Sequence, residues 1–403
     1  MPIPLKSSDP YMIDGLLDLT WVGAMIAALI MTHITIAGVT MYLHRSQAHR
    51  SVDFHPVINH FFRFWLWITT GMVTKQWVGV HRKHHAKSDT PEDPHSPQIL
   101  GLKTLMTRGA ELYRTAADDS AEVDKYGRGA PDDWLENAIY TPHKDKGIFL
   151  MLAIDLLLFG IIGITVWAIQ MIWIPLFAAG VINGIGHYWG YRNYENSDSA
   201  TNISPWGILI GGEELHNNHH AFPGSARLSN KWWEFDIGWL YIKLLSYVGL
   251  AQVRRVAPAP RIERNAAHLD MDAVRALVNG QLNVMADYAR KVTVPALRRA
   301  QDHVASVSAR RELVAIRKLL NRNENLLSDT ERERIAKVVR MDATLATVYQ
   351  FRQRLLQLWE RTMSNDKLLA DLQQWCAEAE DSGIRQLQEF AERMRGYRLQ
   401  PAL

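Results

Sequence analysis

Nine of the sixteen histidines in this sequence gather in four short boxes. Two boxes, HRKHH and HNNHH, share the spacing i, i+3, i+4, which on a helix places three imidazole rings on one face within a turn. Imidazole binds iron, zinc, copper or nickel, and one ion takes about four to six ligands. Nine converging histidines are too many for one ion and therefore predict two. The candidate ligands are His44 and His49 in HRSQAH, His81, His84 and His85 in HRKHH, His187 in NGIGH, and His216, His219 and His220 in HNNHH.

The alternative role for a histidine is packing or a helix end. A buried triplet without partners would leave ring nitrogens unsatisfied at about 1–3 kcal/mol each, which favours the ligand interpretation for both triplets. His44 and His49 are five residues apart and would diverge on an α-helix, so we expect this box where a helix ends. His187 stands alone, and its assignment depends on the other boxes. The histidines assigned to packing or helix ends are His33, His55, His60 and His143.

The composition of the 403 residues excludes several classes of protein. The formal net charge is only +3, which gives no support to nucleic-acid binding. The single cysteine, Cys376, excludes an internal disulfide and removes thiolates from the set of metal ligands. Only Lys6 precedes the first apolar run and no short cleavable pattern follows, so no secretory signal is expected.

Long apolar stretches predict a membrane protein. The stretch 16–43 is almost uncharged over 28 residues, and as a helix it would measure about 42 Å, more than a bilayer core of about 30 Å. Residues 147–190 predict a helical hairpin with a break at 170–175. The stretch 56–80 carries polar interruptions, and a crossing there would separate the first two boxes, so we expect an interfacial or re-entrant helix. The expected spans lie near 16–43, 148–169 and 172–190.

These patterns predict an all-α, integral membrane helical protein with a cytosolic, histidine-lined cap and a soluble helical tail. The polar segment 86–146 is expected to cover the metal site, and basic residues near the boxes favour the cytoplasmic side of the membrane. Three spans would place the N-terminus outside, whereas two short spans within 11–43 would place it inside. The expected domains are an N-terminal lead (1–15), a membrane region (16–257) and a charged helical C-terminal region (258–403), to which the sequence assigns no chemistry.

The four boxes, together with the sequence HNNHHAFP and the following SARLSNKWWEFD, resemble the membrane-bound fatty acid desaturases, specifically the Δ9 (stearoyl-type) branch of bacterial type. The resemblance covers roughly residues 16–255. It implies a di-iron enzyme that uses O2 and two electrons to place a cis double bond in a saturated acyl chain, with the nine histidines as iron ligands. It also implies that Asn183, four residues before His187, holds one iron through a water molecule. A location in a bacterial inner membrane follows, with the site facing the cytoplasm.

Carboxylates close to the boxes are candidates to accept the second ring N–H of a ligand and to fix its orientation. A solvated loop carboxylate is the alternative for each of them. The candidates are Asp89, Asp93, Glu213 and Glu214.

The substrate carrier and the electron donor are less defined. Animal acyl-CoA desaturases carry an Arg-Asp pair directly before the second box, where this sequence has Gly79 and Val80. Long-chain acyl-CoA and acyl-lipid substrates therefore both remain open. The sequence contains no cytochrome b5 domain, so we expect a separate donor, a ferredoxin or a flavoprotein reductase.

Two other functions compete with desaturation. A membrane di-iron hydroxylase uses similar boxes to insert oxygen, and HNNHHAFP with the lone histidine of NGIGH favours desaturation over it. A metal transporter needs polar ligands near the middle of the bilayer, whereas these boxes lie just outside the apolar runs.

Overall fold

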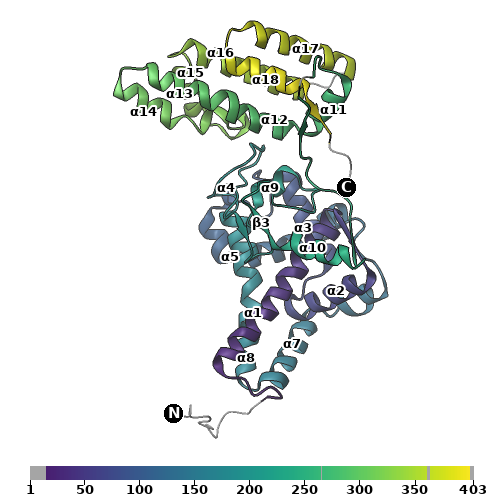
Figure 1. Cartoon of the computed structure of the whole chain (residues 1–403). Helices are drawn as coiled ribbons and strands as arrows, with labels where there is room; N and C mark the ends of the chain where they lie inside the picture. Colours follow the sequence, from purple (N-terminus) through teal and green to yellow (C-terminus); the bar gives the residue numbers. More distant parts are fainter. Residues whose placement is uncertain (1–14, 265, 361–363, 400–403) are drawn as a thin grey trace, which may run out of the picture. The chain divides into compact units, whose positions relative to one another are not determined.

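The computed structural model describes residues 15–264, 266–360 and 364–399, so the expected N-terminal lead lies outside the described residues except for Gly15. The described chain is helical apart from three short two-stranded pairings (Figure 1). It divides into two compact units. The first extends to Tyr191 and resumes over Ala200–Val256, and the second comprises Arg192–Ser199 and the chain from Ala257 onward.

The first long helix changes its hydrogen-bonding register partway along. Helix α1 (Trp21–Ala37) begins where the Thr20 hydroxyl accepts a hydrogen bond from Gly23 N–H at 3.2 Å. It continues without a break into a π-helical segment, η1 (Gly38–Ala48). Together they form a continuous helix of 28 residues, which has the length and composition to cross a bilayer.

The stretch 56–80, expected as one helix, forms parts of two. Helix α2 (Pro56–Thr70) ends at Gly71, whose left-handed conformation (φ 64°) lets its N–H bond the Trp67 carbonyl at 3.2 Å. Helix α3 (Thr74–Lys87) then starts in a new direction and carries HRKHH in its last turns.

The apolar hairpin turns earlier than the sequence suggests. Helix α7 (Lys144–Phe159) ends at Gly160, which has φ 65°, and α8 (Ile162–Ile174) continues directly into a π-helical segment, η3 (Pro175–Ile185). The break expected at 170–175 is therefore wrong. A glycine in a left-handed conformation ends the helix, while Pro175 sits inside a continuous helix of 24 residues.

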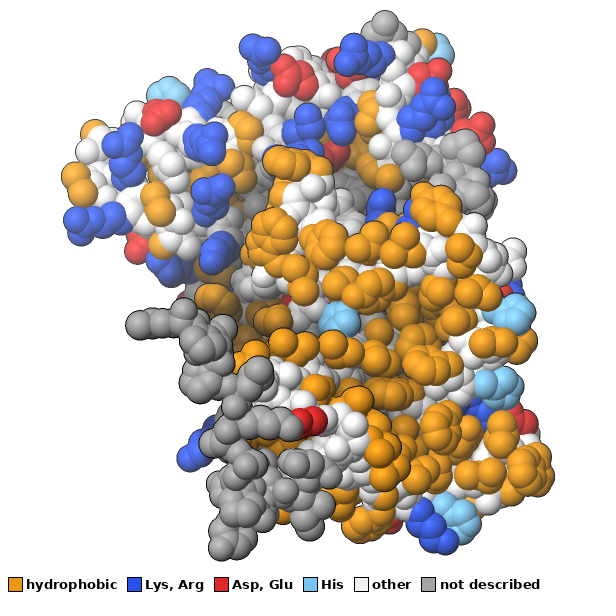
Figure 2. All heavy atoms as spheres, turned by 60° about the horizontal axis from the view of Figure 1, so that its bottom comes forward, with side chains coloured by type: hydrophobic (Ala, Val, Ile, Leu, Met, Phe, Trp, Pro, Cys, Tyr) orange, Lys and Arg blue, Asp and Glu red, His pale blue; other side chains and the backbone are white. Residues whose placement is uncertain are grey.

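The apolar helices pack together and expose a hydrophobic surface. Helix α1 packs against α8, and α7 packs against both α8 and α2. Figure 2 shows a broad hydrophobic face on the molecule. Large apolar side chains on these helices are well exposed, including Met25 at 62%, Leu157 at 62% and Ile172 at 66%. A surface of this kind fits contact with lipid, and the two continuous helices Trp21–Ala48 and Ile162–Ile185 have the length and composition of membrane spans.

Shorter elements complete the first unit and surround the histidine boxes. Helix α5 packs against η3, and α6 packs against α3. Strand β1 pairs antiparallel with β4, and β2 pairs parallel with β3. The remaining elements are β1 (Val52–Phe54), α4 (Pro97–Leu100), α5 (Leu102–Ala117), α6 (Ser120–Tyr126), η2 (Glu136–Tyr140), β2 (Trp206–Gly207), α9 (His216–Ala221), β3 (Phe235–Asp236), α10 (Ile237–Tyr247) and β4 (Ala251–Val253).

The second unit is a helical bundle with its own core. Trp375 and Tyr288 are fully buried at its centre, and the Phe390 ring packs edge-on against Tyr288 at 5.0 Å. The core also takes in Cys376. Its elements are β5 (Arg261–Ile262), α11 (Met271–Asn279), α12 (Gln281–Tyr288), η4 (Ala289–Thr293), α13 (Val294–His303), α14 (Val307–Ala315), η5 (Leu319–Asn321), η6 (Glu324–Leu326), α15 (Asp329–Val339), α16 (Ala343–Glu360), α17 (Asn365–Asp381), α18 (Arg385–Arg395) and β6 (Tyr397–Arg398).

Candidate metal centre

The structure brings all nine histidines of the boxes together in two groups. In the first group, five imidazoles offer ligand nitrogens that all lie within 4.8 Å of one another. The Nε2 atom of His219 is 3.0 Å from Nε2 of His44 and 2.8 Å from Nε2 of His85. The first group consists of His44, His49, His81, His85 and His219.

The π-helical register explains how the first box reaches this group. His49 N–H donates to the His44 carbonyl at 3.0 Å, an i to i+5 bond that closes the wider π turn. Residues five apart then lie above one another, and the His44 and His49 ring centroids are 4.8 Å apart. On an α-helix the same two side chains would point about 140° apart, at 100° per residue.

The second group takes one or two histidines from each of the last three boxes. Four ligand nitrogens lie within 4.8 Å, and His187 Nε2 is 3.0 Å from His216 Nε2. The second group consists of His84, His187, His216 and His220.

Each triplet is divided between the two groups. His84 leaves its neighbours in HRKHH and joins the second group, while His219 of HNNHH joins the first. The three rings of a triplet lie on one face of a helix but do not share one metal site. Because α3 and α9 each contribute to both groups, these two helices fix the distance between the groups.

The donor sets fit metal ions in chemistry and in spacing. Two ligands about 2.1 Å from one ion and at right angles are about 3.0 Å apart, close to the nitrogen separations observed here. Burial, together with the neighbouring imidazoles, holds the pKa of His81, His85, His216 and His220 well below 6.5. The rings are therefore neutral at physiological pH, and each has a lone pair available for a metal ion.

Three of the four candidate carboxylates contact the Nδ1 atom of a grouped histidine. Asp93 lies 3.0 Å from His84 Nδ1, and Asp89 lies 3.2 Å from His187 Nδ1. Glu213 lies 2.7 Å from His44 Nδ1. Such contacts fix the tautomer that presents Nε2 to the metal.

The fourth carboxylate, Glu214, has a different place in the structure. Its two oxygens accept the backbone N–H groups of Ile210 and Gly212 at 2.9 and 3.1 Å. It shapes the turn before HNNHH, and this local use of its oxygens replaces the expected contact with a histidine.

Sequence reasoning missed two buried contacts that hold the boxes in place. Arg45, next to His44, is 1% exposed and forms an ion pair with Asp236 at 2.9 Å. Asn218, inside HNNHH, accepts from Asn202 Nδ2 at 3.1 Å and donates to Glu234 at 2.8 Å. Arg45, Asn218, Glu234 and Asp236 lie within or next to the quoted motifs, whereas Asn202 does not, and nothing in the sequence pairs these residues.

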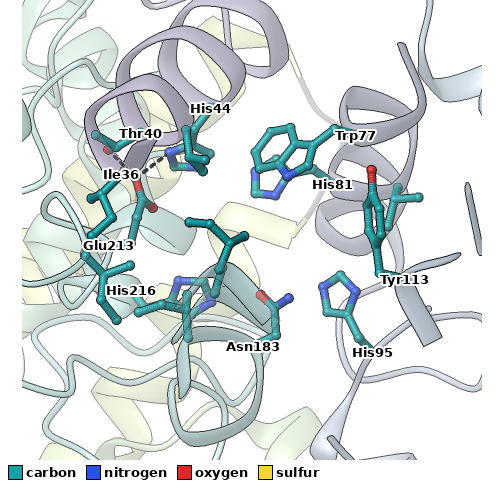
Figure 3. Close-up of a pocket in the computed structure, with 16 residues that line it drawn as sticks. Ile36, Thr40, His44, Trp77, His81, His95, Tyr113, Asn183, Glu213 and His216 are labelled. Atoms are coloured by element: carbon teal, nitrogen blue, oxygen red, sulfur yellow. Dashed lines mark hydrogen bonds and ion pairs between the residues drawn. The ribbon is translucent and has the colours of Figure 1, made fainter. Parts of the chain in front are cut away.

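A mostly apolar cavity adjoins both groups. His44 and His81 of the first group and His216 of the second line it, and Asn183 on η3 projects into it (Figure 3). The Trp77 ring stacks on His81 at 4.8 Å. The apolar part of the wall comes mainly from α1, η1, α8 and η3, with Ile36, Val39, Ile174, Ala178 and Ile182. The cavity therefore places apolar side chains directly beside the candidate metal centre.

Two protein families match parts of the chain, and several known proteins are similar to it. Residues 19–243 match the fatty acid desaturase family, and residues 282–400 match a transposase family. The chain is 31% identical over 238 residues to the sn-1 stearoyl-lipid 9-desaturase of Anabaena variabilis, covering 58% of this chain and 84% of that protein. It is 29% identical over 239 residues to Delta-9 acyl-lipid desaturase 1 of Arabidopsis thaliana, covering 58% and 75%. It is 32% identical over 225 residues to Acyl-CoA 5-desaturase AL21 of Anemone leveillei, covering 54% and 66%. The first match contains all nine grouped histidines, and the second contains none of them.

Proposed function

We propose, because this chain belongs to the fatty acid desaturase family, that it places a cis double bond at Δ9 of a saturated acyl chain carried on a membrane lipid. The observation that carries this proposal is the apolar cavity, which adjoins two groups of converging, neutral histidines. We assign His44, His49, His81, His85 and His219 to one iron, and His84, His187, His216 and His220, with Asn183 through a water molecule, to the other.

The irons, when bound, supply the oxidising power that removes two hydrogens from an unactivated chain with O2 and two electrons. The protein's own residues provide position and a dry environment. Isoleucines from α1, α8 and η3 enclose the chain and exclude water. Glu213, itself held by the Thr40 hydroxyl at 2.7 Å, keeps the proton of His44 on Nδ1, and Asp93 and Asp89 do the same for His84 and His187.

A lipid carrier is favoured over coenzyme A by the residues before the second box. Gly79 and Val80 occupy the positions at which the acyl-CoA enzymes of animals carry an Arg-Asp pair. A Cβ on Gly79 would lie 3.1 Å from the Val123 Cα, so α6 packs tightly where a long charged side chain would have to emerge. The chain is similar both to a stearoyl-lipid desaturase and to an acyl-CoA desaturase, so the similarity alone does not identify the carrier. The tight packing at Gly79 is the feature that favours a lipid carrier.

We assign the enzyme to a bacterial inner membrane with the site facing the cytoplasm. The electrons come from a separate protein, a ferredoxin or a flavoprotein reductase.

Product analysis in a host without its own desaturase tests the proposal. The chain and its His219→Ala variant are expressed there with a supplied reductase system, and double bonds are located by gas chromatography and mass spectrometry. We expect Δ9 monoenes in the lipid fraction with the intact chain and none with the variant. Hydroxylated acids would instead establish a hydroxylase, monoenes confined to acyl-CoA would refute the lipid carrier, and bonds at another position would refute Δ9.

A further inference from the structure

His95 belongs to neither group of histidines, yet it lies against the second one. It is 7% exposed and follows Asp93 closely, and its backbone N–H donates to Asp93 Oδ1 at 3.0 Å. Its ring stacks on the ring of His84 with 4.4 Å between centroids and 28° between planes. The loop that orients His84 through Asp93 therefore also fixes the position of His95.

The His95 ring and the Asn183 side chain both line the cavity. Figure 3 shows the His95 ring and the Asn183 amide extending into the cavity from different elements, the loop before α4 and η3. His95 Nε2 is buried and has no hydrogen-bond partner among the described residues. A buried polar atom without a partner is unfavourable, so we expect this nitrogen to bind a group in the cavity.

We propose that His95 Nε2 and the Asn183 side chain together hold one water molecule at the second group. This inference rests on the proposed metal centre and deepens it, since it adds a positioning residue to the nine ligands and Asn183. A buried water makes about three hydrogen bonds or equivalent contacts, and His95, Asn183 and the ion account for three. A neutral imidazole ring offers one donor and one acceptor nitrogen.

The alternative is that His95 is itself a ligand of the second ion. His84, Asp93 and His95 do place ligand-capable atoms within 4.8 Å of one another. An ion held by these three residues together is disfavoured, because the oxygens of Asp93 already accept hydrogen bonds from His84 and from the His95 backbone. The water-holding role leaves these contacts intact. Whether His95 binds the second ion directly is decided by the iron content of its variants.

Mössbauer spectroscopy of the reduced protein loaded with ⁵⁷Fe tests the proposal, because it reports each iron separately. His95→Phe keeps the ring stacked on His84 and removes the nitrogen. We expect the variant to retain two irons per chain, to change one of two equal signals, and to lose about 10- to 100-fold in turnover. His95→Gln places an amide near the position of Nε2 and should restore the signal.

Asn183→Leu should change the same signal, and the double variant should add little to either single change. His303→Phe, at an exposed histidine on α13, is the matched control and should leave both signals unchanged.

An unchanged spectrum in His95→Phe would overturn the proposal. Loss of one iron from His95→Phe, with Asn183→Leu retaining both, would identify His95 as a ligand and would also overturn it. Circular dichroism shows whether His95→Phe folds. If it does not, Asn183→Leu and His95→Gln test the proposal in its place. A wild-type Mössbauer spectrum in Asn183→Leu would then refute the shared water. Failure of the unmodified chain to bind two irons would refute the proposed function itself, which is a distinct result.

Discussion

Replacing Asp93 by asparagine should weaken metal binding at the second group only. Both oxygens of Asp93 contact His84 Nδ1, at 3.0 and 3.1 Å. Oδ1 also accepts the His95 N–H at 3.0 Å, and Oδ2 accepts the Asp89 N–H at 2.8 Å. An asparagine amide has one oxygen, so either orientation turns an NH2 group toward a backbone N–H and leaves that donor buried without an acceptor.

The magnitude follows from these contacts. One unsatisfied buried N–H costs about 1–3 kcal/mol of stability, most of it local to the loop. Loss of the charged acceptor for His84 should lower metal affinity or activity about 10- to 100-fold. His44 depends on Glu213 and not on Asp93, so the first group should keep its ion.

Iron content measured by inductively coupled plasma mass spectrometry, during competition with a chelator of known affinity, gives the affinity at each group. Wild type should release its two irons at high chelator concentration, whereas Asp93→Asn should release one of them at a 10- to 100-fold lower concentration. Glu92→Gln is the matched control, since Glu92 lies in the same loop and forms only an exposed ion pair with Lys87. If Asp93→Asn keeps both irons up to the same chelator concentration as Glu92→Gln, the reasoning is refuted.

Three further predictions concern stability. Arg45→Met leaves Asp236 charged and buried and should lower the free energy of unfolding, measured by thermal unfolding, by about 3–5 kcal/mol. Arg254→Met, at an exposed ion pair, should lower it by at most about 1 kcal/mol. Equal losses in the two variants would contradict the burial argument. Burial acts to raise the pKa of Asp287, but Arg393 and its other partners lower this pKa overall. The ionised carboxylate therefore stabilises the second unit at pH values above its unfolded pKa of about 3.9. This stabilisation is lost as the pH falls through the lower, folded pKa. The stability difference between wild type and Asp287→Asn should therefore disappear in acid, and a difference independent of pH would be evidence against it. Iron removal should speed amide hydrogen exchange in α3 and α9 but not in α11–α18, because only the first two carry grouped histidines; uniform acceleration would be the contrary result.

The sequence predicted that the histidines of the boxes converge, because this depends on residue type and short spacing. All nine lie in the two groups, although His95, which the sequence did not single out, also packs against the second group. It predicted the helices as well, since long apolar runs leave few other structures in a membrane protein. These inferences use information that is local in the chain.

The misses arise from backbone register and from contacts between distant residues. The prediction that the first box lies where a helix ends is confirmed, since η1 ends at Ala48 with His49 as its cap. The π-helical turn that brings His44 and His49 together was missed, because no simple pattern in the sequence marks such a turn. The hairpin turn was misplaced because Gly160 lies inside an apolar run, although an isolated glycine is a turn signal. The ion pair of Arg45 joins residues 191 positions apart, which no local reading of the chain detects.

The segment Arg192–Ser199 affects where the chain can be divided between its two units. It leaves the first unit shortly after His187, belongs to the second unit, and returns to the first at Ala200. Its Tyr194 is 3% exposed, and Glu195 interacts electrostatically with Arg352 on α16. A region attached through a single linker can be gained or lost by one gene fusion, but here the chain passes between the units three times. A chain cut at Val256 would therefore lose most of the second unit but keep Arg192–Ser199, whose contacts lie mainly in that unit.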